Sequence, residues 1–189
     1  MNTHTFPSPA RRQAGFSIIE MTVAVAIVAA LALAALPAMA GYLQASRVRS
    51  TTSDLFSTLL FARGEAARTN VRVVVCNSAD GSRCAAAGGW EQGWIVFHDT
   101  NGNGVPDAGE PIVQHGHPAA TGLRASGNST VSRYVSYTPE GLAKLVGGGF
   151  QAGTITVCPA SLEPADARQI IVNSGGRPRV QQAHAADCA

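Results

Sequence analysis

Residues 15–36 read GFSIIEMTVAVAIVAALALAAL, and this stretch decides the fold. After its glycine it carries a single charge, Glu20, and it matches the roughly 20 apolar residues that cross a bilayer as a helix. An unpaired carboxylate inside such a helix costs about 2.5–3.5 kcal/mol on insertion scales. The sequence therefore predicts an apolar helix that lies in lipid or in the core of an assembly, with a partner that neutralises Glu20.

The helix is expected to continue over residues 42–69 with a different pattern. Apolar residues there recur at helical spacing, which predicts an amphipathic helix that packs one face on a sheet. A bend is expected at Pro37 or Gly41, because proline removes a backbone donor and clashes with the preceding turn. The predicted apolar face consists of Leu55, Leu59, Ala62 and Ala66.

The chain over residues 70–189 changes to the period of β-strands. Short runs of β-branched and aromatic residues are bounded by Gly, Pro, Asn, Asp or Ser, as strands commonly are. We therefore predict an α+β fold in which a long N-terminal helix packs on an antiparallel sheet. The predicted strands are residues 71–76, 93–97, 133–137, 154–158 and 169–173.

Composition and charge narrow the class of protein. The chain has 189 residues, of which 46% are hydrophobic and 14% charged, which excludes a disordered chain and a polytopic membrane protein. Removing residues 1–15 takes away Arg11 and Arg12 and leaves 12 basic side chains opposite 12 acidic ones. Because bulk attraction to a polyanion is then weak, any binding of nucleic acid must come from a local cluster.

Four cysteines follow the apolar segment, and their even number favours disulfides formed in an oxidising compartment. Four thiols allow three pairings, and a zinc site is the competing interpretation. The spacings supply no close Cys-x-x-Cys pair of the kind that zinc sites use. We predict the pairs Cys76–Cys84 and Cys158–Cys188, because each closes a local loop.

The hexapeptide Gly15-Phe16-Ser17-Ile18-Ile19-Glu20 resembles the class III signal of type IV pilins and pseudopilins. The resemblance implies that a prepilin peptidase removes residues 1–15 and methylates Phe16. It also implies that Glu20 pairs with the N-terminal amine of a neighbouring subunit, and that residues 16–41 form a transmembrane and filament-core helix. The chain would then span the inner membrane once, with a periplasmic domain, and join a pilus. A plain signal anchor with an accidental Glu20 is the alternative.

Two further stretches resemble the FimT/GspH group of minor pilins. Residues 89–99, GWEQGWIVFHD, are similar to the GW-x-x-GW-x-V-F-x-D stretch of that group. Residues 173–180, NSGGRPRV, are similar to the G-R-x-R element of its FimT branch. In that branch the element forms part of a DNA-binding surface used in natural transformation, which implies such a role for Gly176, Arg177 and Arg179.

The chemistry of this element fits a phosphate backbone. In an extended segment Arg177 and Arg179 would project to the same side, roughly 7 Å apart, and Pro178 would hold them spread. Two guanidinium groups so placed suit neighbouring phosphates, and Arg168 and Lys144 are candidates to extend the patch. Without aromatic residues or a recognition helix, binding is expected to be independent of sequence and sensitive to salt.

Two functions of different class follow from this resemblance. The first is a minor pilin that binds DNA during uptake. The second is a purely structural role, as a GspH-like minor pseudopilin of a type II secretion system or an initiator of pilus assembly, with other pilins as its partners. The sequence has no G-x-S-x-G, Walker or dinucleotide-binding motif, so we expect no enzymatic activity.

Residues 99–110, DTNGNGVPDAGE, match the spacing D-x-[DN]-x-[DN]-G-x5-E of calcium loops. The flanking residues, 94–97 and 111–114, read as strands rather than the helices of an EF-hand. The Asn-Gly and Pro-Asp pairs equally describe a long hairpin loop held by Asx turns, which is the interpretation we favour. We thus expect no cofactor, with Ca²⁺ as the alternative. Its oxygen ligands would be Asp99, Asn101, Asn103 and Glu110.

Overall fold

The computed structural model describes residues 15–160, 167–183 and 185–188, with only the backbone described at residues 34, 36–38, 185 and 186. The predicted leader lies outside the described residues, apart from Gly15. The described chain forms one long helix, α1 (Ile18–Thr69), followed by eight strands and three short 3-10 helices. It divides into two compact units, residues 1–40 and 41–189, which are described separately below.

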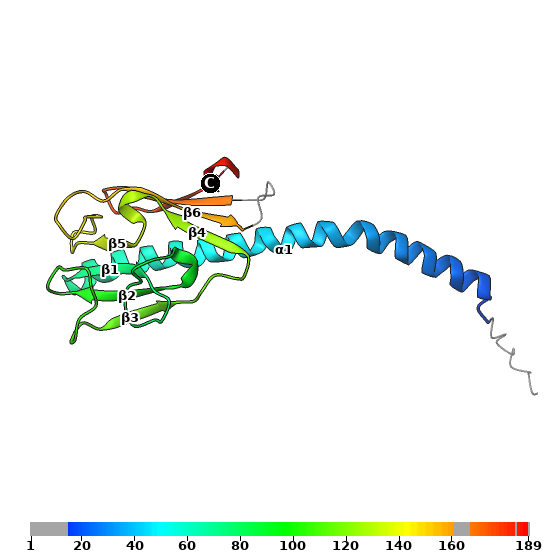
Figure 1. Ribbon diagram of the computed structural model, residues 1–189, viewed down its shortest axis with the longest axis horizontal. Coiled ribbons are helices and arrows are strands. Elements are labelled where there is room, and N and C mark those ends of the chain that lie inside the picture. Colours follow the sequence, from blue (N-terminus) through cyan, green and yellow to red (C-terminus); the bar gives the residue numbers. More distant parts are fainter. Residues whose placement is uncertain (1–14, 161–166, 184, 189) are drawn as a thin grey trace, which may run out of the picture. The chain divides into compact units, whose positions relative to one another are not determined.

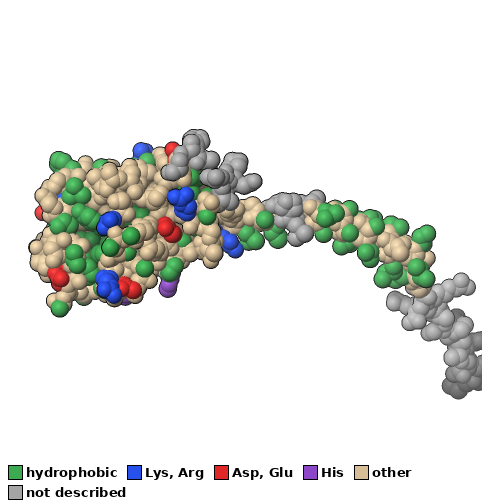
Figure 2. Space-filling model, viewed as in Figure 1, with side chains coloured by type: hydrophobic (Ala, Val, Ile, Leu, Met, Phe, Trp, Pro, Cys, Tyr) green, Lys and Arg blue, Asp and Glu red, His purple; other side chains and the backbone are tan. Residues whose placement is uncertain are grey.

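In the first unit, α1 presents large apolar side chains without a buried face. Ile18 is 85% exposed and Leu33 is 76% exposed, and Figure 2 shows hydrophobic side chains along this part of the helix. No helix in the described part of the chain is both long and apolar enough to count as a candidate membrane span. Insertion of residues 16–41 into a membrane therefore stays a prediction.

In the second unit, α1 carries the buried face that the sequence predicts. Leu55, Leu59, Ala62 and Ala66 have no exposed surface. Thr51, Thr52, Thr58 and Glu65 are also buried, but many other polar and charged residues of the helix are exposed, as expected for a helix that packs one face. These exposed residues include Arg49, Ser53, Ser57 and Arg68.

Two four-stranded antiparallel sheets follow the helix (Figure 1). The first sheet contains, in spatial order, β3 (Ile112–Gly116), β2 (Trp94–Asp99), β1 (Arg72–Asn77) and β5 (Tyr134–Tyr137). The second contains β4 (Leu123–Gly127), β6 (Gly153–Pro159), β7 (Ala167–Val172) and β8 (Arg179–Ala183).

The α+β class is confirmed, but the expectation of one sheet is wrong. Strands β4 and β8, both at edges of the second sheet, were not predicted. Leu123–Gly127 has only two buried residues, and every residue of Arg179–Ala183 is at least partly exposed. Because edge strands with so little buried surface lack the apolar runs that identify inner strands, their sequences resemble loops.

One hydrophobic core joins α1 to both sheets. It contains Leu59 of the helix, Val75 and Tyr137 of the first sheet, and Ile155 and Ile170 of the second. A smaller cluster covers the other face of the first sheet, around Val74, Ile95 and Phe97. The inner strands β1 and β2 are thus buried on both faces, which explains their continuous apolar sequences.

Both predicted disulfides are present. Cys76 in β1 is bonded to Cys84, with their Cα atoms 5.5 Å apart, and this bond lies in the smaller cluster. Cys158 in β6 is bonded to Cys188, with a Cα separation of 5.9 Å, and ties the 3-10 helix Ala185–Cys188 to the second sheet. The described residues contain no free cysteine, so the zinc interpretation is wrong.

Candidate functional site

The predicted cleavage site lies just before the helix. Gly15, Phe16 and Ser17 are not helical, and α1 begins at Ile18. Phe16 is 79% exposed, so the bond between Gly15 and Phe16 is accessible to a peptidase. Glu20 is exposed in the first turn of α1.

Replacing Gly15 by Val should leave the precursor uncleaved, because the resemblance to the class III signal implies cleavage directly after this glycine. The measurement is the intact mass of the purified chain, together with N-terminal sequencing. As a control, Ser17→Ala should be cleaved and methylated as in the wild type. A Gly15→Val chain that starts at a methylated Phe16 would contradict the class III assignment.

Arg177 and Arg179 follow a tight turn that joins β7 to β8. The Gly176 N–H donates to the Asn173 carbonyl oxygen at 2.9 Å, and the Arg177 N–H donates to Asn173 Oδ1 at 3.2 Å. Arg177 and Arg179 are exposed, whereas Pro178 between them is buried. This alternation is what an extended segment produces when residues i and i+2 project to one side.

Gly176 fixes where this turn lies. Its φ is 72°, in the left-handed region, and a Cβ atom there would overlap the Gly141 carbonyl oxygen. A second contact, from the Ala143 N–H to the Ser174 carbonyl oxygen at 3.2 Å, holds the two segments together. The arginine segment therefore rests on residues 138–141, hereafter the Gly141 turn, which the Gly141 N–H closes by donating to the Thr138 carbonyl oxygen at 2.8 Å.

The structure separates Arg168 from Arg179. Arg179 pairs with Ile171 across the β7–β8 ladder, whereas Arg168 opposes Val157, a core residue of β6. Directly opposed residues share a face of a sheet, so Arg168 faces the core side and Arg179 the outer side. Arg168 Nε is buried and has no hydrogen-bond partner among the described residues. Arg168 is therefore not part of the same patch.

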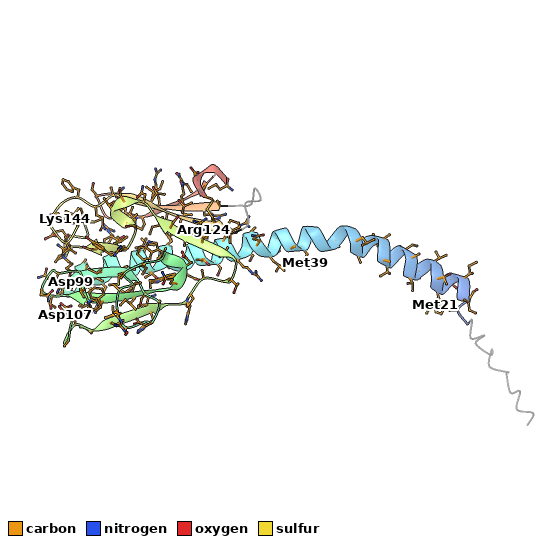
Figure 3. All side chains as sticks on the ribbon, in the orientation of Figure 1. Met21, Met39, Asp99, Asp107, Arg124 and Lys144 are labelled. Atoms are coloured by element: carbon orange, nitrogen blue, oxygen red, sulfur yellow. A yellow bond between two sulfur atoms is a disulfide. The ribbon has the colours of Figure 1, made fainter. Side chains whose placement is uncertain are left out.

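Lys144, which is labelled in Figure 3, directly follows Ala143, shortly after the Gly141 turn. Its side chain is half-buried. The same turn carries an acidic residue, the exposed Glu140. A hydrogen bond from the Thr138 hydroxyl, with a smaller contribution from the nearby Lys144, lowers the pKa of Glu140. The ionised carboxylate of Glu140 therefore lies near the cationic side chain of Lys144.

The predicted calcium residues lie in the loop between β2 and β3, where Figure 3 labels Asp99 and Asp107. The two strands pair as an antiparallel hairpin, so the hairpin interpretation is confirmed. Asp99 is almost fully buried and accepts hydrogen bonds from the N–H groups of Asn103 and Gly104, at 3.0 and 3.1 Å. Burial raises the pKa of Asp99 despite these two bonds.

The remaining oxygen-bearing side chains of this loop contact each other and the backbone. Glu110 Oε1 accepts a hydrogen bond from the Thr100 N–H at 2.7 Å. The amides of Asn101 and Asn103 donate to Asp107 Oδ2, at 2.9 and 2.6 Å. No three His, Cys, Asp or Glu side chains are grouped as metal ligands in the described ranges. The loop closes through its own hydrogen bonds, and calcium binding stays the untested alternative.

Two solved structures illustrate what the chain is similar to. The type IV minor pilin FimU of Pseudomonas aeruginosa (strain PAO1) is 20% identical, with a TM-score of 0.50, over 75% of this chain and 91% of FimU. The minor pseudopilin EpsH of the Vibrio cholerae type II secretion system is 11% identical, with a TM-score of 0.47, over 75% of this chain and 97% of EpsH. No curated protein matches the sequence.

Two sequence families match the chain directly. The prokaryotic N-terminal methylation motif matches residues 10–36, which include Gly15, Phe16 and Glu20. The Type II transport protein GspH matches residues 51–176, more than half of the chain. Together the two matches imply processing of a prepilin and association with other pilins. The chain therefore belongs to the GspH family and is a minor pilin or pseudopilin with a type IV pilin-like fold.

Proposed function

We propose that this minor pilin binds DNA through Gly176, Arg177 and Arg179 and acts in DNA uptake during natural transformation. The observation that supports the proposal is the pair of exposed arginines that follows the turn at Gly176. Arg177 and Arg179 are exposed, the residue between them, Pro178, is buried, and Gly176 packs against the Gly141 turn. Because the backbone of this segment is held in place, only the two side chains lose conformational entropy when they bind phosphates, which favours binding.

The charge of the chain makes this binding local. After removal of the leader, basic and acidic side chains are equal in number, so the field of the whole domain does not attract a polyanion. Binding then depends on the few cations at the site. We expect contact with the phosphate backbone, weak binding by each subunit and a steep dependence on salt.

The test is a gel shift with the processed full-length chain in detergent and a fluorescent DNA duplex at low salt. The double variant Arg177→Gln/Arg179→Gln should lose the shift. In a salt titration, the slope of log K against log salt concentration should fall by about 2, because two phosphate contacts are lost. As a control, Arg47→Gln/Arg133→Gln removes two exposed charges elsewhere and should keep the wild-type slope. Equal binding by the first double variant would contradict the proposal.

A purely structural role is the second candidate. Its support is that the match to the GspH family ends at residue 176, so Arg177 and Arg179 lie beyond the part of the chain that the family defines. In that role the chain would contact only other pilin subunits. The gel shift separates the two candidates, since a structural pseudopilin has no reason to bind DNA at any salt concentration.

We also propose that residues 16–41 hold the precursor in the inner membrane, with the β-rich domain in the periplasm. The two disulfides support an oxidising compartment for residues 70–189. The exposed apolar side chains of α1, among them Ile19, Val28 and Leu31, support burial of this segment in lipid or in a filament. After assembly the domain would lie on the surface of the pilus.

A further inference from the structure

We propose that Arg63 of helix α1 is a third phosphate-binding residue of the DNA site, beside Arg177 and Arg179. The inference rests on the proposed function and adds to it a residue from a distant part of the sequence. The ligand chemistry is an oxygen of a phosphodiester backbone. Nothing in the sequence around Arg63 suggests this role, because the residue lies in the amphipathic half of the helix.

The Gly141 carbonyl group brings Arg63 to the arginine segment. Arg63 Nε donates to the Gly141 carbonyl oxygen at 3.0 Å, across 78 residues of sequence. The same oxygen is the atom that a Cβ at Gly176 would overlap. One carbonyl therefore touches both the guanidinium of Arg63 and the glycine that precedes Arg177. Arg63 thus lies beside the start of the proposed DNA-binding segment.

The guanidinium group of Arg63 has N–H donors that make no hydrogen bond within the described residues. Within the described residues its only hydrogen bond is the one from Nε, so Nη1 and Nη2 have no hydrogen-bond or ion-pair partner. Two other arginines of the domain do have acidic partners, since Arg68 bonds Glu65 and Arg83 bonds Asp80. Arg63 is half-buried, and the bond from Nε to the Gly141 carbonyl oxygen holds its guanidinium in place.

The bond to Gly141 also orients this group. An arginine that uses Nε to bind a carbonyl presents both NH₂ groups in one plane, which is the fork that suits two oxygens of one phosphate. The only acidic residue of the Gly141 turn, Glu140, is exposed and makes no ion pair with Arg63 among the described residues. An arriving phosphate would therefore supply the anion that Arg63 lacks.

The experiment measures the affinity of the processed full-length chain in detergent for a fluorescent duplex over a range of salt. Arg63→Gln should weaken binding severalfold at low salt and lower the slope of log K against log salt by about 0.9, the value for one phosphate contact. Arg63→Lys keeps the charge and should restore most of the slope. Arg47→Gln, an exposed arginine on the same helix, should change neither quantity.

The outcomes separate this inference from the proposed function. If Arg177→Gln/Arg179→Gln abolishes binding while Arg63→Gln keeps the wild-type slope, Arg63 is not a phosphate ligand and the proposed function stands. If Arg63→Gln and Arg63→Lys weaken binding equally, lower the melting temperature and leave the slope unchanged, Arg63 only supports the Gly141 turn and the inference is overturned. If no arginine variant affects binding, the proposed function fails as well.

Discussion

Replacing Trp90 by Ala is expected to destabilise the β-rich domain by about 3–5 kcal/mol, the usual cost of removing a buried indole from a core. Trp90 has no exposed surface and belongs to the core that joins the helix to both sheets. Its Nε1 donates to the Val131 carbonyl oxygen at 3.0 Å. The substitution therefore leaves a cavity and an unpaired carbonyl, and it removes a large part of the 5–15 kcal/mol that stabilises an average domain.

Urea unfolding followed by far-ultraviolet circular dichroism, with both disulfides oxidised, measures this cost. Trp90→Phe is the matched variant, because it keeps most of the apolar surface and loses only the N–H donor and part of the ring. We expect it to cost about 1–2 kcal/mol. A cost below about 1 kcal/mol for Trp90→Ala would contradict the central place of this residue in the core.

The motif around Trp90 shows how a resemblance identifies residues without giving their physical role. The sequence pattern GW-x-x-GW points to a family, but only the structure shows that Trp94 Nε1 donates to the Thr58 hydroxyl of α1 at 3.1 Å. Gly93 has a φ of 105°, and a Cβ there would lie 2.9 Å from the Gly116 carbonyl oxygen. Glu91 accepts a hydrogen bond from the Ala125 N–H of β4 at 2.9 Å. The motif thus connects the helix to both sheets.

Short-range patterns in the sequence are sufficient to predict the elements that bury much apolar surface. The spacing of Leu55 and Leu59 predicted the packed face of α1, and the two cysteine pairs were predicted because each closes a short loop. Strands β4 and β8 could not be predicted in this way, because backbone pairing with the neighbouring strand, rather than burial of their own side chains, holds them in the sheet. The division into two sheets depends on which strands pair, and a strand's sequence does not specify its neighbour.

Some features of the candidate site follow from the local sequence, and others depend on the fold. Arg177, Pro178 and Arg179 are adjacent in sequence, so their spacing and stiffness were predictable. The exclusion of Arg168 was not, because it depends on which face of β7 meets Val157. The contact of Arg63 with Gly141 spans 78 residues and joins a helix to a turn. Contacts of that kind arise only from the packed fold, so no local pattern could predict them.

Replacing Glu20 by Leu is expected to abolish assembly without affecting processing. In the proposed membrane-inserted precursor, an unpaired Glu20 costs about 2.5–3.5 kcal/mol, and pairing with the terminal amine of a neighbouring subunit would remove that cost in the filament. Leucine stabilises the membrane-embedded chain and offers no partner to the amine. The substitution therefore stabilises the membrane state and destabilises the filament. Since each 1.4 kcal/mol is a factor of ten, the fraction of the chain in pili should fall by about a hundredfold.

Immunoblots of sheared pili and of membranes measure this fraction directly. Met21→Leu is the control, since Met21 is the next residue of the same exposed helix and its replacement leaves the carboxylate in place. The control should assemble as the wild type does. N-terminal sequencing of the Glu20→Leu chain should still begin at a methylated Phe16, which distinguishes an assembly defect from the processing defect of Gly15→Val. Wild-type amounts of the Glu20→Leu chain in pili would show that the carboxylate has no partner in the filament, and the reason for its place in an apolar helix would then lie elsewhere.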